Sequence, residues 1–321
     1  MTLRTDKFKD NILVYSLLMI LSISSIIQVS LAWSNGGYSS DSSNISYGTH
    51  DWIAQHALDW LPDNRKQYIL DNLQFYLYGT ELPDNGNAPD GIGDTSRHHI
   101  YYHSDETLQD DSAASRAKVE YEKALNYLKQ SDLKNAAKCA GIMTHYIADM
   151  SAFGHVMGSE TDWGKEIHHS DYENYVNTRT SNYNSEFSQF LEFDGQLDNI
   201  SAYSSALNLA YDTTFDKKGS SSALWMDQNY NWNNSTFKNR AIESLNLAIN
   251  YITDVLYTLS IEANTPNQVT TIPSTTDKLP SSTPQTSTPI SSGALELALS
   301  LLLVVLAVVI IALAYLKGKR R

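Results

Sequence analysis

The sequence contains one cysteine, Cys139, among 321 residues. A single cysteine excludes an intramolecular disulfide, so a packed core or bound metal must supply the stability. Cations are also scarce, because 23 Lys and Arg stand against 36 Asp and Glu, which gives a formal net charge of −13. Nucleic-acid binding draws on lysine and arginine contacts with phosphate, so this composition disfavours a broad nucleic-acid surface and favours divalent cations.

Residues 1–32 have the pattern of a secretory signal peptide. Three cations precede an apolar run that ends with small residues at positions 30 and 32, which is typical of a cleavage site. We therefore predict a mature chain that begins at Trp33. An uncleaved N-terminal anchor is the alternative, because the apolar run is long for a signal peptide.

The other end of the chain predicts attachment to a membrane. Residues 294–316 are apolar for a length that crosses a bilayer, and the basic residues 317–321 follow as a cytoplasmic tail. Residues 263–293 are rich in Ser, Thr and Pro, a composition that predicts an extended stalk without a core. These ends predict a single-pass protein of the cell membrane with an extracellular N-terminal domain. The two terminal segments together carry a formal net charge of +4, which leaves a charge of −17 on the remainder of the chain.

Residues 33–262 predict a single all-α domain built as a helical bundle. No alternating strand pattern of convincing length appears, whereas apolar residues recur at helical spacing through several segments. Residues 132–150 become almost wholly apolar or small, which is typical of the central helix of a bundle. The predicted helical segments are 49–62, 113–130, 132–150, 170–193 and 236–260, and loops are expected at 33–48, 79–105 and 216–235.

Ionisable residues interrupt the apolar stretch "HYIADMSAFGH". His145 and Asp149 are spaced i, i+4, which places both side chains on one helical face, and His155 follows beyond a glycine. His169 and Glu173 repeat the i, i+4 spacing farther along the chain. Upstream, the same residue types occur at His50 on an apolar stripe, at Asp84 and at the pair His98-His99.

Each of these residues alone has an ordinary structural explanation, such as a core histidine or a surface hydrogen bond. Their conjunction does not, because burying so many ionisable groups without partners would cost several kcal/mol apiece. Imidazole and carboxylate without thiolate suit zinc in a catalytic role, or another borderline divalent ion. The excess of ligands predicts a cluster of several ions, and the hydrolysis of phosphate esters is the chemistry that such clusters serve.

These motifs together resemble the zinc-dependent phospholipase C family, which is related to the fungal single-strand nucleases. The resemblance is carried by the spacing His-x₃-Asp-x₅-His-x₁₃-His-x₃-Glu from His145 to Glu173, and by the earlier residues Trp33, His50 and Asp84. It implies a helical bundle whose cleft holds three zinc ions.

The resemblance also implies a ligand for each ion. Asp84, His99, His145 and Asp149 would hold one ion, and His155, His169 and Glu173 a second. The amino group and carbonyl oxygen of Trp33 would hold the third with His50, while Asp149 bridges it to the first. Asp84 would also be the general base of the reaction. The doubled histidines leave two choices open by one residue: His99 is favoured over His98 by the aromatic residue two positions on, and His169 over His168 by its spacing to Glu173.

The leading functional prediction is a surface-anchored zinc phosphodiesterase that hydrolyses phospholipids in the manner of a phospholipase C. An exported zinc-dependent single-strand nuclease is the first alternative, since metal ions in a cleft can attract a polyanion to an acidic protein. A phospholipase D-type hydrolase is another, because "GTELPDN" and "ADMSAFGH" also resemble the enzyme that cleaves glycosylphosphatidylinositol anchors. A third class is a non-enzymatic surface protein that metal stabilises.

Overall fold

The computed structural model describes residue 39 and residues 41–264. The predicted signal peptide, Trp33, the predicted membrane helix at 294–316 and the predicted tail at 317–321 lie outside these described residues, as does the predicted stalk apart from residues 263–264, which are helical. Within them, no helix is both long and apolar enough to cross a membrane.

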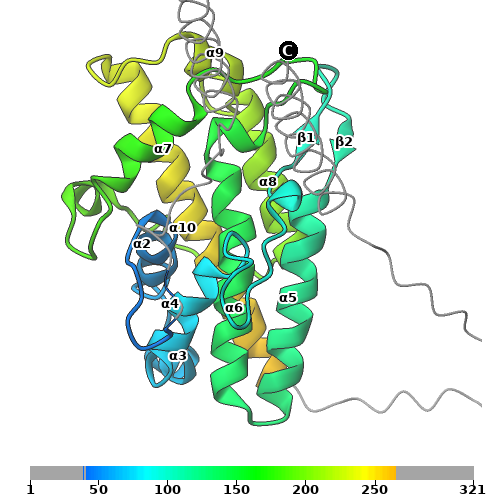
Figure 1. The fold of residues 1–321 in the computed structure, drawn as a ribbon, viewed down its shortest axis with the longest axis vertical. Helices are drawn as coiled ribbons and strands as arrows, with labels where there is room; N and C mark the ends of the chain where they lie inside the picture. Colours follow the sequence, from blue (N-terminus) through cyan, green and yellow to red (C-terminus); the bar gives the residue numbers. More distant parts are fainter. Residues whose placement is uncertain (1–38, 40, 265–321) are drawn as a thin grey trace, which may run out of the picture. The chain divides into compact units, whose positions relative to one another are not determined.

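Helices dominate the described part of the chain (Figure 1). In chain order the elements are α2 (Thr49–His56), α3 (Asp63–Leu70), α4 (Leu73–Glu81), the 3₁₀ helix η1 (Thr95–Arg97), β1 (Tyr101–Tyr102), β2 (Leu108–Asp110), α5 (Ser112–Lys129), α6 (Leu133–Ala148), the 3₁₀ helices η2 (Asp149–Ser151) and η3 (Phe153–His155), α7 (His169–Asn177), η4 (Glu186–Phe190), α8 (Ala202–Phe215), α9 (Ala223–Gln228) and α10 (Ser235–Asn264).

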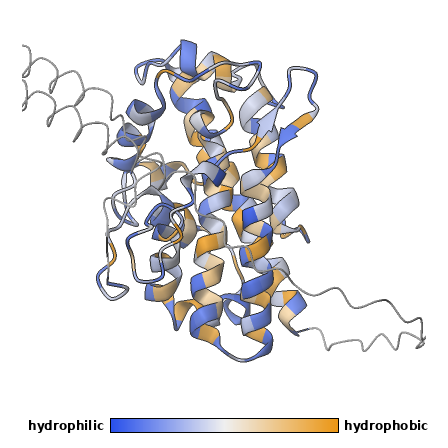
Figure 2. Cartoon of the chain, turned by 45° about the vertical axis from the view of Figure 1, so that its right-hand side comes forward, coloured by the Kyte–Doolittle hydropathy of each residue, from blue (hydrophilic) through white to orange (hydrophobic). Residues whose placement is uncertain are grey.

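Helix α6 lies at the centre of the bundle and packs against α4 and α5, with α10 crossing behind it (Figure 1). It begins after Asp132, whose side chain accepts a hydrogen bond from the backbone N–H of Asn135. From Ala136 onward almost all of its residues are buried, as the apolar character of 132–150 predicts. Figure 2 shows the corresponding pattern, with apolar residues on facing sides of the helices and polar residues outside.

Two glycines bring α4 and α6 into backbone contact. A Cβ placed on Gly141 of α6 would overlap the carbonyl oxygen of Tyr76, and one placed on Gly79 of α4 would overlap that of Lys138. Only glycine allows two helices to approach this closely, so the pair fixes the spacing of α4 and α6. This contact lies one turn before His145 and directly beside Thr80.

The prediction of an all-α domain needs one correction, because the chain forms a small sheet in the predicted loop 79–105 and in the short segment that follows it, before the helix predicted at 113–130. Strands β1 and β2 pair antiparallel, with Tyr101 opposite Asp110 and Tyr102 opposite Leu108. Glu106 adopts a positive φ of 68° in the connecting turn. The strands are two and three residues long, too short to show an alternating pattern in the sequence. The domain is therefore mostly helical.

Candidate metal centre

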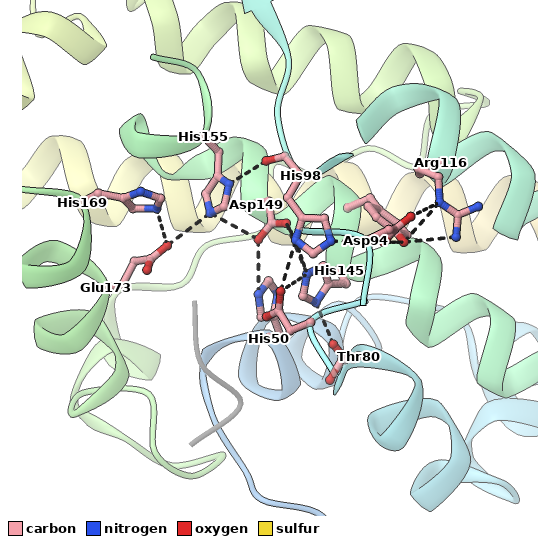
Figure 3. Close-up of polar contacts among 12 residues, drawn as sticks. His50, Thr80, Asp94, His98, Arg116, His145, Asp149, His155, His169 and Glu173 are labelled. Carbon is pink, nitrogen blue, oxygen red and sulfur yellow. Dashed lines mark hydrogen bonds and ion pairs between the residues drawn. The ribbon is translucent and has the colours of Figure 1, made fainter. Parts of the chain in front are cut away.

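Eight ionisable side chains from separate segments meet beside the C-terminal end of α6 (Figure 3). The bundle supplies them from helix ends and short connections, where the backbone can turn a side chain inward. They are His50 in the first turn of α2, Asp84 after α4, His98 after η1, His145 in the last turn of α6, Asp149 in η2, His155 in η3, and His169 and Glu173 on α7.

Asp149 is the centre of this cluster, and its side chain is fully buried. Its Oδ2 lies 3.2 Å from Nδ1 of His98 and 3.3 Å from Nε2 of His145. Its Oδ1 lies 3.3 Å from Nε2 of His50 and 3.7 Å from Nε2 of His155. Each carboxylate oxygen therefore faces a different pair of imidazoles.

Asp84 completes the side of the cluster that Oδ2 of Asp149 faces. Its Oδ1 lies 3.2 Å from Nδ1 of His98 and 3.7 Å from Nε2 of His145. Unlike Asp149, Asp84 is partly exposed, with 25% of its side chain accessible to solvent. It is therefore placed to contact both the buried cluster and a molecule that enters from outside.

A second group forms where η3 meets α7. Oε1 of Glu173 lies 2.7 Å from Nε2 of His169 and 3.2 Å from Nε2 of His155. Nδ1 of His155 donates to the carbonyl oxygen of His98 at 2.6 Å, which turns its Nε2 toward the acids. The i, i+4 spacing on α7 thus produces the pair that the sequence predicts.

The donor atoms gather closely enough to share metal ions. In each of three groups the candidate atoms lie within 4.8 Å of one another: His50 with Asp84 and His145; His98 with His145 and Asp149; and His155 with His169 and Glu173. His145 belongs to two of these groups, so the sites would adjoin.

The carboxylates and imidazoles of the cluster shift one another's pKa values. Burial alone would raise the pKa of Asp149, but His145 and then His155 outweigh it and hold that pKa well below its usual value. Burial alone would lower the pKa of His98, yet Asp84 and Asp94 raise it to about 10. Metal ions would displace protons from such imidazoles, because a ligating imidazole must be neutral.

Several buried oxygens support the fit of a cation. Both oxygens of Asp149, Oδ1 of Asp84 and Oε2 of Glu173 are buried and accept no hydrogen bond from the residues that the structure describes. Buried carboxylates without hydrogen bonds are costly unless a cation pairs with them. Nitrogen and oxygen donors without sulfur suit zinc at a reactive centre, so the residues fit the predicted metal.

The sequence profile of zinc-dependent phospholipase C matches residues 49–243. The chain belongs to the zinc-dependent phospholipase C family. Among solved structures, it is similar to the alpha toxin of Clostridium absonum, with 16% identity and a TM-score of 0.47, over 71% of this chain and 66% of the toxin. It is also similar to the Clostridium perfringens alpha-toxin from avian strain SWCP, with 15% identity and a TM-score of 0.44, over 67% of this chain and 64% of the toxin.

The chain thus spans just under two thirds of the length of these toxins. No curated protein matches it.

Family membership does not decide between neighbouring histidines, and here the structure corrects the sequence prediction. His98, not His99, enters the cluster. The His99 ring turns away to lie 3.3 Å from Asp110 and stacks on Tyr101 at 4.3 Å. The aromatic residue two positions on therefore packs against His99 and does not indicate a ligand. At the second pair, the structure places His169 in the cluster, while His168 stacks on Tyr230.

Sequence reasoning missed Asp94, which lies beside His98. Oδ1 of Asp94 is 3.5 Å from Nε2 of His98 and accepts a hydrogen bond from the Tyr146 hydroxyl at 2.6 Å. Its other oxygen accepts from Nε of Arg116 at 2.7 Å. Asp94 and His98 are also four residues apart, but they lie in a segment predicted as a loop, where this spacing does not place two side chains on one face.

A cleft of about 430 Å³ opens onto the cluster. It is lined by His98, His155 and His169 of the cluster, by His99 and Tyr101, and by the acids Glu160 and Glu166. A cleft of this volume accommodates a small phosphodiester beside the candidate ligands.

Proposed function

We propose that this protein is a zinc-dependent phosphoric diester hydrolase that cleaves phospholipids in the manner of a phospholipase C. The observation that carries the proposal is Asp149, whose two oxygens face separate imidazole pairs, and one imidazole of each pair, His98 and His155, also lines an open cleft. Membership of the zinc-dependent phospholipase C family supplies the substrate class.

The geometry supports a specific set of ligands. Asp84, His98, His145 and Asp149 would hold one ion, with His98 in the place that the sequence assigned to His99. His155, His169 and Glu173 would hold a second ion.

His50 and Asp149, whose Nε2 and Oδ1 are 3.3 Å apart, would contribute ligands to a third ion. The predicted contribution of Trp33 to that third ion concerns a residue outside the described part of the chain. Both the number of ions and the role of Trp33 belong to the proposal.

The side chains of the cluster would have different parts in the reaction. Zinc, when bound, would lower the pKa of a water molecule and neutralise negative charge on the phosphate. Asp84 reaches both the cluster and solvent, so it can accept a proton from an attacking water and orient that water. Asp149 on η2 and His145 on α6 are fully buried, so the surrounding packing would hold both side chains in place during the reaction.

We further propose that the enzyme is exported and held at the cell surface by residues 294–316. This part of the proposal rests on the sequence patterns of the two ends. An anchored enzyme would meet its substrate in a membrane. Its acidic body would then depend on the metal centre, and not on surface cations, to attract phosphate.

Product analysis tests the function and separates the alternatives. The full chain, purified in detergent and loaded with zinc, should release a phosphorylated head group and diacylglycerol from phosphatidylcholine, and a strong chelator should abolish this release. Free head group with phosphatidic acid would indicate phospholipase D chemistry. Nucleotide release from single-stranded DNA without lipid turnover would identify a nuclease. No turnover of either substrate by the zinc-loaded protein would favour the metal-stabilised, non-enzymatic alternative.

A further inference from the structure

The imidazole of His98 lies between two sets of acids. Its Nδ1 faces the cluster, 3.2 Å from Asp84 and 3.2 Å from Asp149. Its Nε2 points the opposite way, 3.5 Å from Oδ1 of Asp94 (Figure 3). Nε2 is buried and has no hydrogen-bond partner of good geometry in the described part of the chain, so Asp94 is the acceptor nearest to it.

Asp94 is itself held in place by groups outside the cluster. The Tyr146 hydroxyl donates to its Oδ1 at 2.6 Å, and Nε of Arg116 donates to its Oδ2 at 2.7 Å. Arg116 in turn donates to the buried Glu120 at 3.0 Å, on the same face of α5. Helices α5 and α6 therefore fix this carboxylate before any metal binds.

Two other histidines of the cluster, His145 and His155, are oriented by backbone carbonyls, whereas Nδ1 of His169 faces Glu166 at 3.5 Å. Nδ1 of His145 donates to the carbonyl oxygen of Thr80 at 2.7 Å, and Nδ1 of His155 donates to that of His98 at 2.6 Å. Both residues consequently present Nε2 to the cluster. His98 is arranged in the reverse sense, with Nδ1 inward and a charged acceptor behind it.

We propose that Asp94 is a positioning residue of the metal centre: it accepts the Nε2–H of His98, selects that tautomer and leaves the Nδ1 lone pair for the metal ion. The proposal rests on the metal site of the proposed function. A neutral imidazole carries one N–H, so an acceptor behind one nitrogen frees the other to bind. A carboxylate in that place also makes the imidazole a stronger ligand, and losing such a partner typically weakens metal binding 10- to 100-fold.

Zinc affinity tests the proposal without a substrate. The affinity of the full chain for zinc would be measured by competition with a chromogenic chelator. Asp94→Ala should bind the weakest ion about 10- to 100-fold less tightly, whereas Asp94→Asn should lose less because its amide oxygen still accepts a hydrogen bond. Asp90→Asn is the matched control: Asp90 lies in the same connection, and its half-exposed carboxylate pairs with Lys138 at 2.8 Å. Equal affinities in Asp94→Ala and Asp90→Asn would overturn the proposal.

The tautomer gives a second readout that a purely structural role would not change. In the full chain loaded with ¹¹³Cd and labelled with ¹⁵N at histidine, the cadmium coupling of His98 should appear on Nδ1 and the ring proton on Nε2. Asp94→Ala should weaken or abolish that coupling while circular dichroism of the metal-free protein stays unchanged. Cadmium coupling to Nε2 of His98 in the unsubstituted protein would refute the proposal.

These measurements keep the two proposals apart. If Asp94→Ala binds zinc as tightly as the wild-type protein does, only the role of Asp94 is refuted. Weakened binding in a protein that hydrolyses no phospholipid would refute only the proposed function.

Discussion

Replacing Asp149 with alanine should disturb two metal positions at once. Its Oδ2 faces His98 and His145, and its Oδ1 faces His50 and His155, all within 3.2–3.7 Å. Removing a residue that only hydrogen-bonds to a metal ligand typically lowers metal affinity 10- to 100-fold. Removing a ligand itself should therefore lower the affinity of each metal position at least that much. Two affected positions together give about 10²- to 10⁴-fold, or about 2.7–5.5 kcal/mol.

Glu173→Ala is the matched comparison for Asp149→Ala. Glu173 is also buried, but it contacts only His155 and His169 among the candidate ligands. Elemental analysis after gel filtration should therefore show a greater loss of zinc from Asp149→Ala than from Glu173→Ala, with helical content preserved in both. Phospholipid hydrolysis should fall below detection in Asp149→Ala. Full zinc content or full activity in that variant would refute the reasoning, and equal losses in the two variants would refute the bridging role.

Four further outcomes are expected. His98→Ala should lose zinc while His99→Ala retains it, and the reverse result would restore the original assignment. Gly141→Ala should lower the free energy of unfolding by about 1–3 kcal/mol in urea denaturation, because its Cβ would overlap the Tyr76 carbonyl; an unchanged midpoint would contradict this. Acidification below about pH 5–6 should release the metal, because ligating histidines become protonated; zinc retained through dialysis at pH 4 would oppose the assignment. Burial, followed by the charges of neighbouring acids, raises the pKa of Asp254 to about 6 from 3.8. The folded protein therefore binds this proton more tightly, and the resulting stability is present below about pH 4 and lost as pH rises through 6. The difference in the free energy of unfolding between Asp254→Asn and wild type should consequently shift by about 1 kcal/mol in favour of the variant from pH 4 to pH 8. A difference that does not depend on pH would refute this.

The sequence predicted the helical bundle and two of the acid–histidine pairs that the structure brings together, because both features depend on local spacing. The i, i+4 relations of His145 with Asp149 and of His169 with Glu173 place donors on one helical face whatever the rest of the fold does. The apolar and small residues of 132–150 likewise require burial on all sides. Such features can be predicted from the sequence because a helix has a fixed period.

The choice between His98 and His99 could not be made in this way. Both lie in the connection from η1 to β1, where adjacent side chains point in different directions and no helical period applies. Their orientation is set by distant partners, namely Asp94 behind His98 and Asp110 beside His99. The short sheet was missed for a related reason, since strands of two and three residues depend on their pairing more than on their composition.

The glycine contact between α4 and α6 makes helix spacing a determinant of metal chemistry. Gly79 precedes Thr80, whose carbonyl oxygen accepts from Nδ1 of His145, and Gly141 stands one turn before that histidine. The distance between the two backbones therefore decides whether this imidazole keeps its proton on Nδ1 and offers Nε2 to the cluster. A side chain inserted between the helices would disturb the packing and also the hydrogen bond that orients His145 toward a bound metal ion. Under the proposed function, the residues that would govern reactivity therefore extend to Gly79 and Gly141, which do not line the cleft.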